Sequence, residues 1–153
     1  MTNELHFSDN GCAFLEESEG KRSKKYCDTE GNWTIGIGHL IKAGETFPEE
    51  LTEEQIYDLL KNDVKTAADD VNRMVKVPLT QNQFDALVCL VFNIGGALFY
   101  KSSILRLLNE GNYEEAGNRF TLYNKERIDG ELVENDGLTA RREREQELFF
   151  TES

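Results

Sequence analysis

Along the first forty residues, the pattern of apolar and polar positions changes from helical to strand-like. Residues 8–19 carry apolar side chains at helical spacing behind a capping Ser8 or Asp9, and Gly20 ends this segment because glycine readily adopts the left-handed conformation. Residues 28–31, Asp-Thr-Glu-Gly, are typical of a turn. The next segment predicts a strand, because larger apolar residues alternate with smaller ones at Trp33, Ile35 and Ile37.

From residue 52 onward, the apolar positions recur with the period of helices. A capping box at residues 52–55 opens a long amphipathic helix, which we expect over 52–74. A second capping box follows Pro78, at residues 80–83, and opens a segment that is apolar on most sides and ends at Gly95-Gly96. A helix that is apolar nearly all round belongs at the centre of the molecule.

The C-terminal third predicts two short helices, a loop and a final helix. The first short helix, over 102–108, is capped by Ser102 or Ser103, and the second covers 112–123. A polar loop with two glycines follows over 124–137. Thr139 then caps the final helix, which begins at residue 139. The whole chain, 1–153, then forms a single α+β domain with room for a cleft. A small strand-containing N-terminal lobe covers about 12–51. A long connecting helix, about 52–74, leads to a mainly helical lobe at about 75–153.

Composition agrees with one globular domain, since 39% of the 153 residues are hydrophobic and 30% are charged. The net charge of −12 argues against binding nucleic acid or an anionic membrane through bulk electrostatics. The most apolar segment, 84–99, contains Asp85 and is shorter than the roughly 20 residues of a membrane span, so we expect no membrane insertion. The acidic N-terminus does not resemble a signal peptide.

Three cysteines, Cys12, Cys27 and Cys89, form neither a CxxC pair nor a set with nearby histidines. They therefore predict no disulfide framework and no zinc site, and they fit reduced thiols in the cytoplasm. Cys89 lies in an apolar run and is expected to be a core residue. We predict neither a metal nor a cofactor.

Two acids stand out by position among the 29 of the chain. Glu19 comes at the end of the first helix, where the helix dipole disfavours a carboxylate, and Asp28 follows nine residues later at the turn. Hydrolysis of a glycosidic bond needs two carboxyl groups in different protonation states. Glu19 and Asp28 are candidates for this pair, although spacing alone is weak evidence in so acidic a chain.

The motifs around these acids resemble the phage-type lysozymes. Glu19-Gly20, Asp28-Thr-Glu-Gly and the run from Trp33 to Leu40 reproduce that family's Glu-x8-Asp-x5-Thr spacing, with Thr34 as its threonine. The resemblance continues through most of the chain, in Pro78-Leu-Thr-Gln-x-Gln-Phe-Asp-Ala-Leu87, Phe92-Asn93-x-Gly95, Phe99-x-x-Ser102 and Gly137-Leu-x-x-Arg141-Arg142-x-x-Glu145. It implies two lobes joined by a long helix, with the sugar chain lying between them.

The resemblance also assigns roles to individual residues. It implies that Glu19 is the general acid, Asp28 the second carboxylate and Thr34 the hydroxyl that helps to place the attacking water, while Arg141 pairs with Glu19. His39 is expected to be a structural group paired with Asp63, near the sugar. The further substrate-binding candidates in or near the family's cleft are His39, Leu40, Phe92, Asn93, Ser102 and Arg141.

The function implied is that of an endolysin, a muramidase that hydrolyses the β-1,4 bond between N-acetylmuramic acid and N-acetylglucosamine in bacterial peptidoglycan. We expect a monomer that is made in the host cytoplasm and reaches the cell wall through a separate membrane pore. The basic residues among 21–25 are either a solvated turn or a guide for anionic peptidoglycan. The alternatives are a non-catalytic peptidoglycan-binding module of a virion or secretion device, a lyase that forms an anhydro sugar, and a chitin-cutting enzyme.

Overall fold

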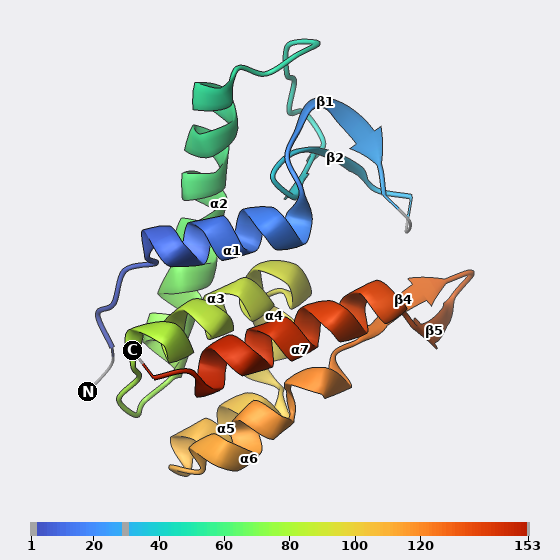
Figure 1. Cartoon of the computed structure of the whole chain (residues 1–153). Coiled ribbons are helices and arrows are strands. Elements are labelled where there is room, and N and C mark those ends of the chain that lie inside the picture. The colour runs from blue at the N-terminus through green and yellow to red at the C-terminus, as the bar shows by residue number, and fades with distance from the viewer. Residues whose placement is uncertain (1–2, 29–30, 153) are drawn as a thin grey trace.

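The computed structural model describes residues 3–28 and 31–152; Thr29 and Glu30 of the predicted turn lie outside the described residues. The fold combines a small sheet with a mostly helical body (Figure 1). In order, the elements are α1 (Asp9–Glu19), β1 (Arg22–Cys27), β2 (Trp33–Gly36), β3 (His39–Leu40), α2 (Glu53–Met74), α3 (Gln81–Ile94), α4 (Gly96–Tyr100), α5 (Ser103–Asn109), α6 (Tyr113–Asn118), the 3-10 turn η1 (Phe120–Leu122), β4 (Lys125–Ile128), β5 (Glu131–Glu134) and α7 (Asp136–Phe150).

The N-terminal sheet is antiparallel, with β2 between β1 and β3. Its register places Thr34 opposite Tyr26 on one side and Leu40 on the other. The strand predicted around Ile35 is confirmed, and it ends at Gly36, whose φ of 68° is available to few residues other than glycine. Helix α1 begins behind Ser8, as predicted, and packs on α3 of the helical body.

Helix α2 runs from the helical body to the sheet, and α3 lies at the centre of the body (Figure 1). Both predicted capping boxes are present, because Thr52 and Thr80 each accept a hydrogen bond from the backbone amide three residues on. Every residue from Phe84 to Val91 is buried, which confirms the prediction of a central helix. Buried Asp85 is satisfied there by Ser8 and Gln81.

The C-terminal third differs from the sequence prediction in three places. The loop expected over 124–137 is wrong, because β4 and β5 pair there as an exposed antiparallel hairpin. The expected Thr139 cap is also wrong: Asn135 caps α7 by accepting a hydrogen bond from the amide of Leu138 at 2.9 Å. The helix expected over 112–123 is shorter, since α6 ends at Asn118 and the chain tightens into η1.

The expected end of the central helix is confirmed at Gly95, whose φ is 89°. The chain then turns directly into the short helix α4, which the sequence pattern did not predict. The architecture is the predicted α+β arrangement of a strand-containing region, a long helix and a mainly helical remainder. Within the described residues, no helix combines the length and apolar character required to cross a bilayer.

Candidate active site

Glu19 lies where α1 ends, facing the turn between β2 and β3. Gly20 follows it with a φ of 77°, so the chain leaves the helix abruptly and turns into β1. The carboxyl group packs against Gly38, where a Cβ atom would stand 2.8 Å from the carboxyl carbon of Glu19. Gly38 therefore leaves the room that this carboxyl group occupies, and its own φ of 69° suits glycine.

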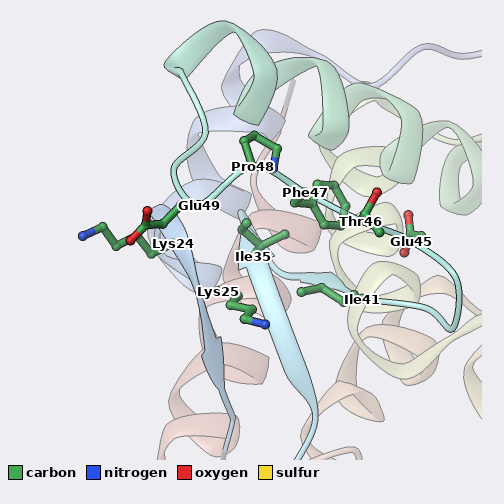
Figure 2. Close-up of a pocket in the computed structure, with 9 residues that line it drawn as sticks. All are labelled: Lys24, Lys25, Ile35, Ile41, Glu45, Thr46, Phe47, Pro48 and Glu49. Atoms are coloured by element: carbon green, nitrogen blue, oxygen red, sulfur yellow. The ribbon is translucent and has the colours of Figure 1, made fainter.

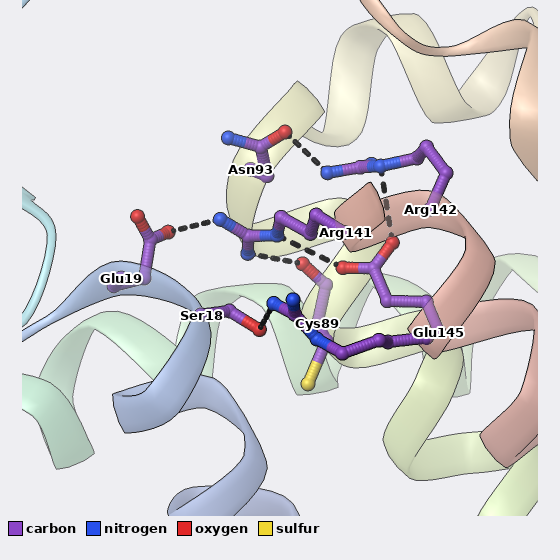
Figure 3. A network of polar contacts seen from close by, with 8 residues as sticks. Ser18, Glu19, Cys89, Asn93, Arg141, Arg142 and Glu145 are labelled. Atoms are coloured by element: carbon purple, nitrogen blue, oxygen red, sulfur yellow. Dashed lines mark hydrogen bonds and ion pairs between the residues drawn. The ribbon is translucent and has the colours of Figure 1, made fainter. Parts of the chain in front are cut away.

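Arg141 of α7 holds Glu19 from the helical body, as predicted. Its guanidinium lies 2.9 Å from a carboxylate oxygen of Glu19 and 3.1 Å from one of Glu145, and it also donates to the carbonyl of Cys89 (Figure 3). Only 6% of the Arg141 side chain and 17% of the Glu19 side chain are exposed. The acid is thus fixed by a largely buried ion pair.

The network continues beyond Arg141 to the end of α3. Glu145 is fully buried and lies 3.2 Å from Nε of Arg142, whose other end donates to the side-chain oxygen of Asn93 at 2.5 Å (Figure 3). Burial is the main cause that lowers the pKa of Arg142 to about 10, and burial also raises the pKa of Glu145. Burial alone would lower the pKa of Arg141, but its two carboxylate neighbours outweigh that effect and raise it.

Asp28 lies directly after β1 and closes the turn of the hairpin. One of its carboxylate oxygens accepts a hydrogen bond from the backbone amide of Asn32 at 2.8 Å. Asp28 also lines a groove of about 630 Å³ together with Asn93 and residues of α4, η1, the β4–β5 hairpin and α7. Asp28 therefore borders an open space between the sheet and the helical body.

Thr34 occupies the middle of the central strand and is only 3% exposed. Its hydroxyl donates to the carbonyl of Asn32, at 3.4 Å, and its strand partner is Tyr26. Burial raises the pKa of Tyr26, and the charge of Glu19 adds to that shift. Tyr26 is therefore within electrostatic reach of Glu19, a neighbour that the sequence analysis did not name.

His39 is paired with Asp63, as predicted, at a distance of 2.7 Å between Nδ1 and a carboxylate oxygen. The structure adds a partner that the sequence analysis missed: Glu45 lies 3.1 Å from Nε2 of the same ring. Glu45 also accepts a hydrogen bond from the backbone amide of Lys42, and this bond, followed by the one to His39, lowers the pKa of Glu45. Because His39 is only 5% exposed with both ring nitrogens engaged, it joins the loop after β3 to α2.

We expect Glu45→Gln to destabilise the protein in a pH-dependent way. A group whose pKa is lower in the folded state stabilises the fold above its unfolded value, and this contribution is lost as the pH falls through the folded value. The unfolding free energy of Glu45→Gln should therefore lie below that of the wild type at pH 6 and approach it near pH 3. Urea unfolding at both pH values measures this, with exposed Glu49→Gln as the control; an equal difference at both would contradict it.

The substrate-binding candidates do not all lie together. Asn93 shares the groove with Asp28, and Arg141 contacts Glu19. A separate cavity of about 250 Å³ is lined by His39, half-exposed Leu40 and Phe92. Ser102 is brought to neither place: it is buried, and its hydroxyl caps α5 and donates to the carbonyl of Phe99.

Some basic residues after Gly20 make local contacts, and the others line a pocket that is separate from the groove at Asp28. Lys21 forms an ion pair with Glu53, and the Arg22 guanidinium lies over the ring of Tyr26. Lys24 and Lys25 line a pocket of about 440 Å³ on an apolar floor that includes Ile35 and Phe47 (Figure 2). Neither predicted catalytic acid lines this pocket, so the cluster does not extend directly into the groove at Asp28.

Comparison with known proteins shows where this arrangement belongs. The family model "Phage lysozyme" matches residues 16–145, which include both acids and the arginine pair. The chain belongs to the phage lysozyme family. It is 40% identical to an endolysin of Salmonella phage P22, covering 96% of this chain and 99% of the relative, and 37% identical to an endolysin of Acyrthosiphon pisum secondary endosymbiont phage 1, covering 95% and 98%.

A solved structure agrees with the family assignment. The endolysin from Escherichia coli O157:H7 phage FAHEc1 superposes with a TM-score of 0.91 at 31% identity, covering 98% of this chain and 96% of that one. This lysozyme is accordingly a glycoside hydrolase of the muramidase type. Within the described part of the chain, no three histidine, cysteine, aspartate or glutamate side chains are arranged to hold a metal ion.

Proposed function

We propose that this lysozyme is an endolysin that hydrolyses the β-1,4 bond between N-acetylmuramic acid and N-acetylglucosamine in bacterial peptidoglycan. The observation that carries the proposal is the contrast between its two acids. Glu19 is held in a mostly buried ion pair, whereas Asp28 faces an open groove. Two carboxyl groups in different environments are what an acid–base division of labour requires.

In the mechanism we propose, Glu19 protonates the oxygen of the leaving sugar. The C–O bond to the anomeric carbon then breaks, and the positive charge that develops there is stabilised by the carboxylate of Asp28. Asp28 and Thr34 position a water molecule, whose oxygen bonds to the anomeric carbon while the carboxylate of Asp28 takes up the proton that the water loses. Asn93, on the same groove as Asp28, contacts the sugar chain in this mechanism, and Leu40 and Phe92 line the separate cavity.

The products distinguish this mechanism from its alternatives. Digestion of purified peptidoglycan should yield fragments that carry one added water, with the anomeric configuration inverted in the first product, because the attacking water approaches from the face opposite the leaving group. Mass spectrometry and early-time NMR of the anomeric protons measure both. Anhydro products would indicate a lyase, retained configuration would contradict the placement of water by Asp28 and Thr34, and binding without cleavage would indicate a non-catalytic module.

We further propose that residues 1–153 work as one domain and as a monomer, made in the host cytoplasm and released to the wall through a separate membrane pore. The groove at Asp28, which is lined by both polar and apolar side chains, suits a glycan strand, and the net charge of −12 disfavours nucleic acid as a partner. Sedimentation of the purified protein tests the monomer. Lysis of host cells with and without a co-expressed pore-forming protein tests the release.

A further inference from the structure

The carboxyl group of Glu145 lies between two arginines in the interior, one of which contacts Glu19. It is fully buried and accepts from Nε of Arg141 at 3.1 Å, while its other oxygen lies 3.2 Å from Nε of Arg142. All three side chains come from α7, where Glu145 follows Arg141 by four residues and Arg142 by three, the two spacings that bring side chains together on a helix surface. Glu145 thus joins two positively charged groups that would otherwise repel each other in the protein interior.

Each arginine connects Glu145 to a different part of the proposed site. Arg141 reaches Glu19 at the end of α1, and Arg142 reaches Asn93 at the end of α3 (Figure 3). Because the side-chain oxygen of Asn93 accepts from Arg142, its amide nitrogen is the atom left to donate toward a ligand. Figure 3 shows this nitrogen pointing away from Arg142.

We propose that Glu145 is a positioning residue for the reaction, which holds Arg141 against Glu19 and Arg142 against Asn93 and offsets the charge of both arginines. The proposal rests on the proposed function of Glu19 as the general acid. Glu145 does not need to touch the substrate, since it acts through the two arginines.

The count of charges explains why the reaction needs Glu145. Two arginines and two carboxylates are neutral together when Glu19 is ionised, and they carry one positive charge when Glu19 holds the proton it must donate. Without the Glu145 charge, the protonated state would carry two positive charges in a buried setting, which disfavours it. Glu145 therefore favours the protonated form of Glu19 while Arg141 stays in contact with it.

Other charged or titratable groups near Glu19 come from several elements. They are Arg141, Arg142 and Glu145 from α7, Tyr26 from β1 and Cys89 from α3, and Asp28 after β1 acts on Tyr26 as Glu19 does. Burial raises the pKa values of both Tyr26 and Cys89, which keeps these two groups neutral near neutral pH. The arginines and Glu145 therefore set the balance of charge on the side of the helical body.

The test is the pH dependence of cleavage in charge variants of α7. Glu145→Gln should move the alkaline limb of the kcat/KM profile down by about one pH unit, since the substitution removes a like, negative charge that disfavours the ionised form of Glu19. Arg142→Gln should move it up, and the double variant should return it toward the wild-type position. Exposed Glu147→Gln is the matched control on the same helix and should leave the limb unchanged.

A second measurement separates this proposal from the function on which it rests. The carboxyl carbon of Glu19 can be titrated by NMR without substrate, and its midpoint should move in the same directions in the same variants. If Glu19→Gln remains active, the proposed function fails, whereas the NMR midpoints still test the role of Glu145. Should Glu145→Gln not fold, Arg142→Gln carries the test alone. The proposal would be overturned if folded Glu145→Gln kept both the alkaline limb of the kcat/KM profile and the NMR midpoint of Glu19 at their wild-type positions. A downward shift of either one in Arg142→Gln would overturn it as well.

Discussion

Replacing Glu19 by glutamine is expected to lower turnover on peptidoglycan by about 100-fold or more. Glutamine has nearly the size of glutamate and its amide oxygen can still accept from Arg141, so the contact at 2.9 Å is largely preserved. The amide cannot donate the proton that the leaving oxygen requires. The variant should therefore bind the glycan strand and cleave it very slowly.

The measurement is the rate of release of soluble fragments from purified peptidoglycan, alongside zymography. Glu17→Gln is the matched control, because Glu17 is exposed on the same helix two residues earlier. Circular dichroism and thermal unfolding establish that both variants are folded. Clearing of peptidoglycan by folded Glu19→Gln at a rate near that of the wild type would show that another residue is the acid.

Replacing Arg141 by methionine is expected to lower the free energy of unfolding by about 3 kcal/mol or more. The substitution keeps an unbranched apolar stem and removes the charge, so Glu145 loses one of its two arginines and Glu19 loses its ion pair. A buried charge without its partner is strongly destabilising. The carbonyl of Cys89 also loses a donor.

Urea unfolding measures the loss at pH 7. Arg144→Met is the control, since Arg144 lies three residues later on the same helix, is exposed, and donates to the hydroxyl of Ser18. That change should cost less than about 1 kcal/mol, as expected for an exposed polar contact. A similar small cost for Arg141→Met would mean that the pair with Glu19 contributes little to the fold.

Local sequence signals predicted most of the helices because their physical causes are local. Thr52 and Thr80 each mark the start of a helix, because the side chain accepts a hydrogen bond from the backbone amide three residues later. The sequence predictions were wrong where two local signals compete or where the local signal is weak. Asn135 and Thr139 are both capable caps, and the hairpin over 125–134 has so little apolar alternation that it resembled a loop.

Only the family motif distinguished the two candidate acids in the sequence. Spacing and composition could not separate Glu19 and Asp28 from the other carboxylates, whereas the family's threonine at the right distance could. For Glu145 a signal was present: its spacing from Arg141 and Arg142 places the three on one face of a helix. Glu45 had no such signal, because the contact with His39 depends on how the loop after β3 folds back.

The sequence by itself determined the order and type of most elements, the central buried helix and the identity of the family motif, since capping, periodicity and residue spacing are properties of neighbouring residues. Only the tertiary structure decided which charges are buried and what they contact. Glu19, Arg141 and Cys89 come from three helices far apart in the chain, and they meet because α1 and α7 both pack against α3. These distant partners determine how much free energy it costs to bury the charge of Glu19. The residues that surround Glu19 in the sequence therefore do not predict that cost.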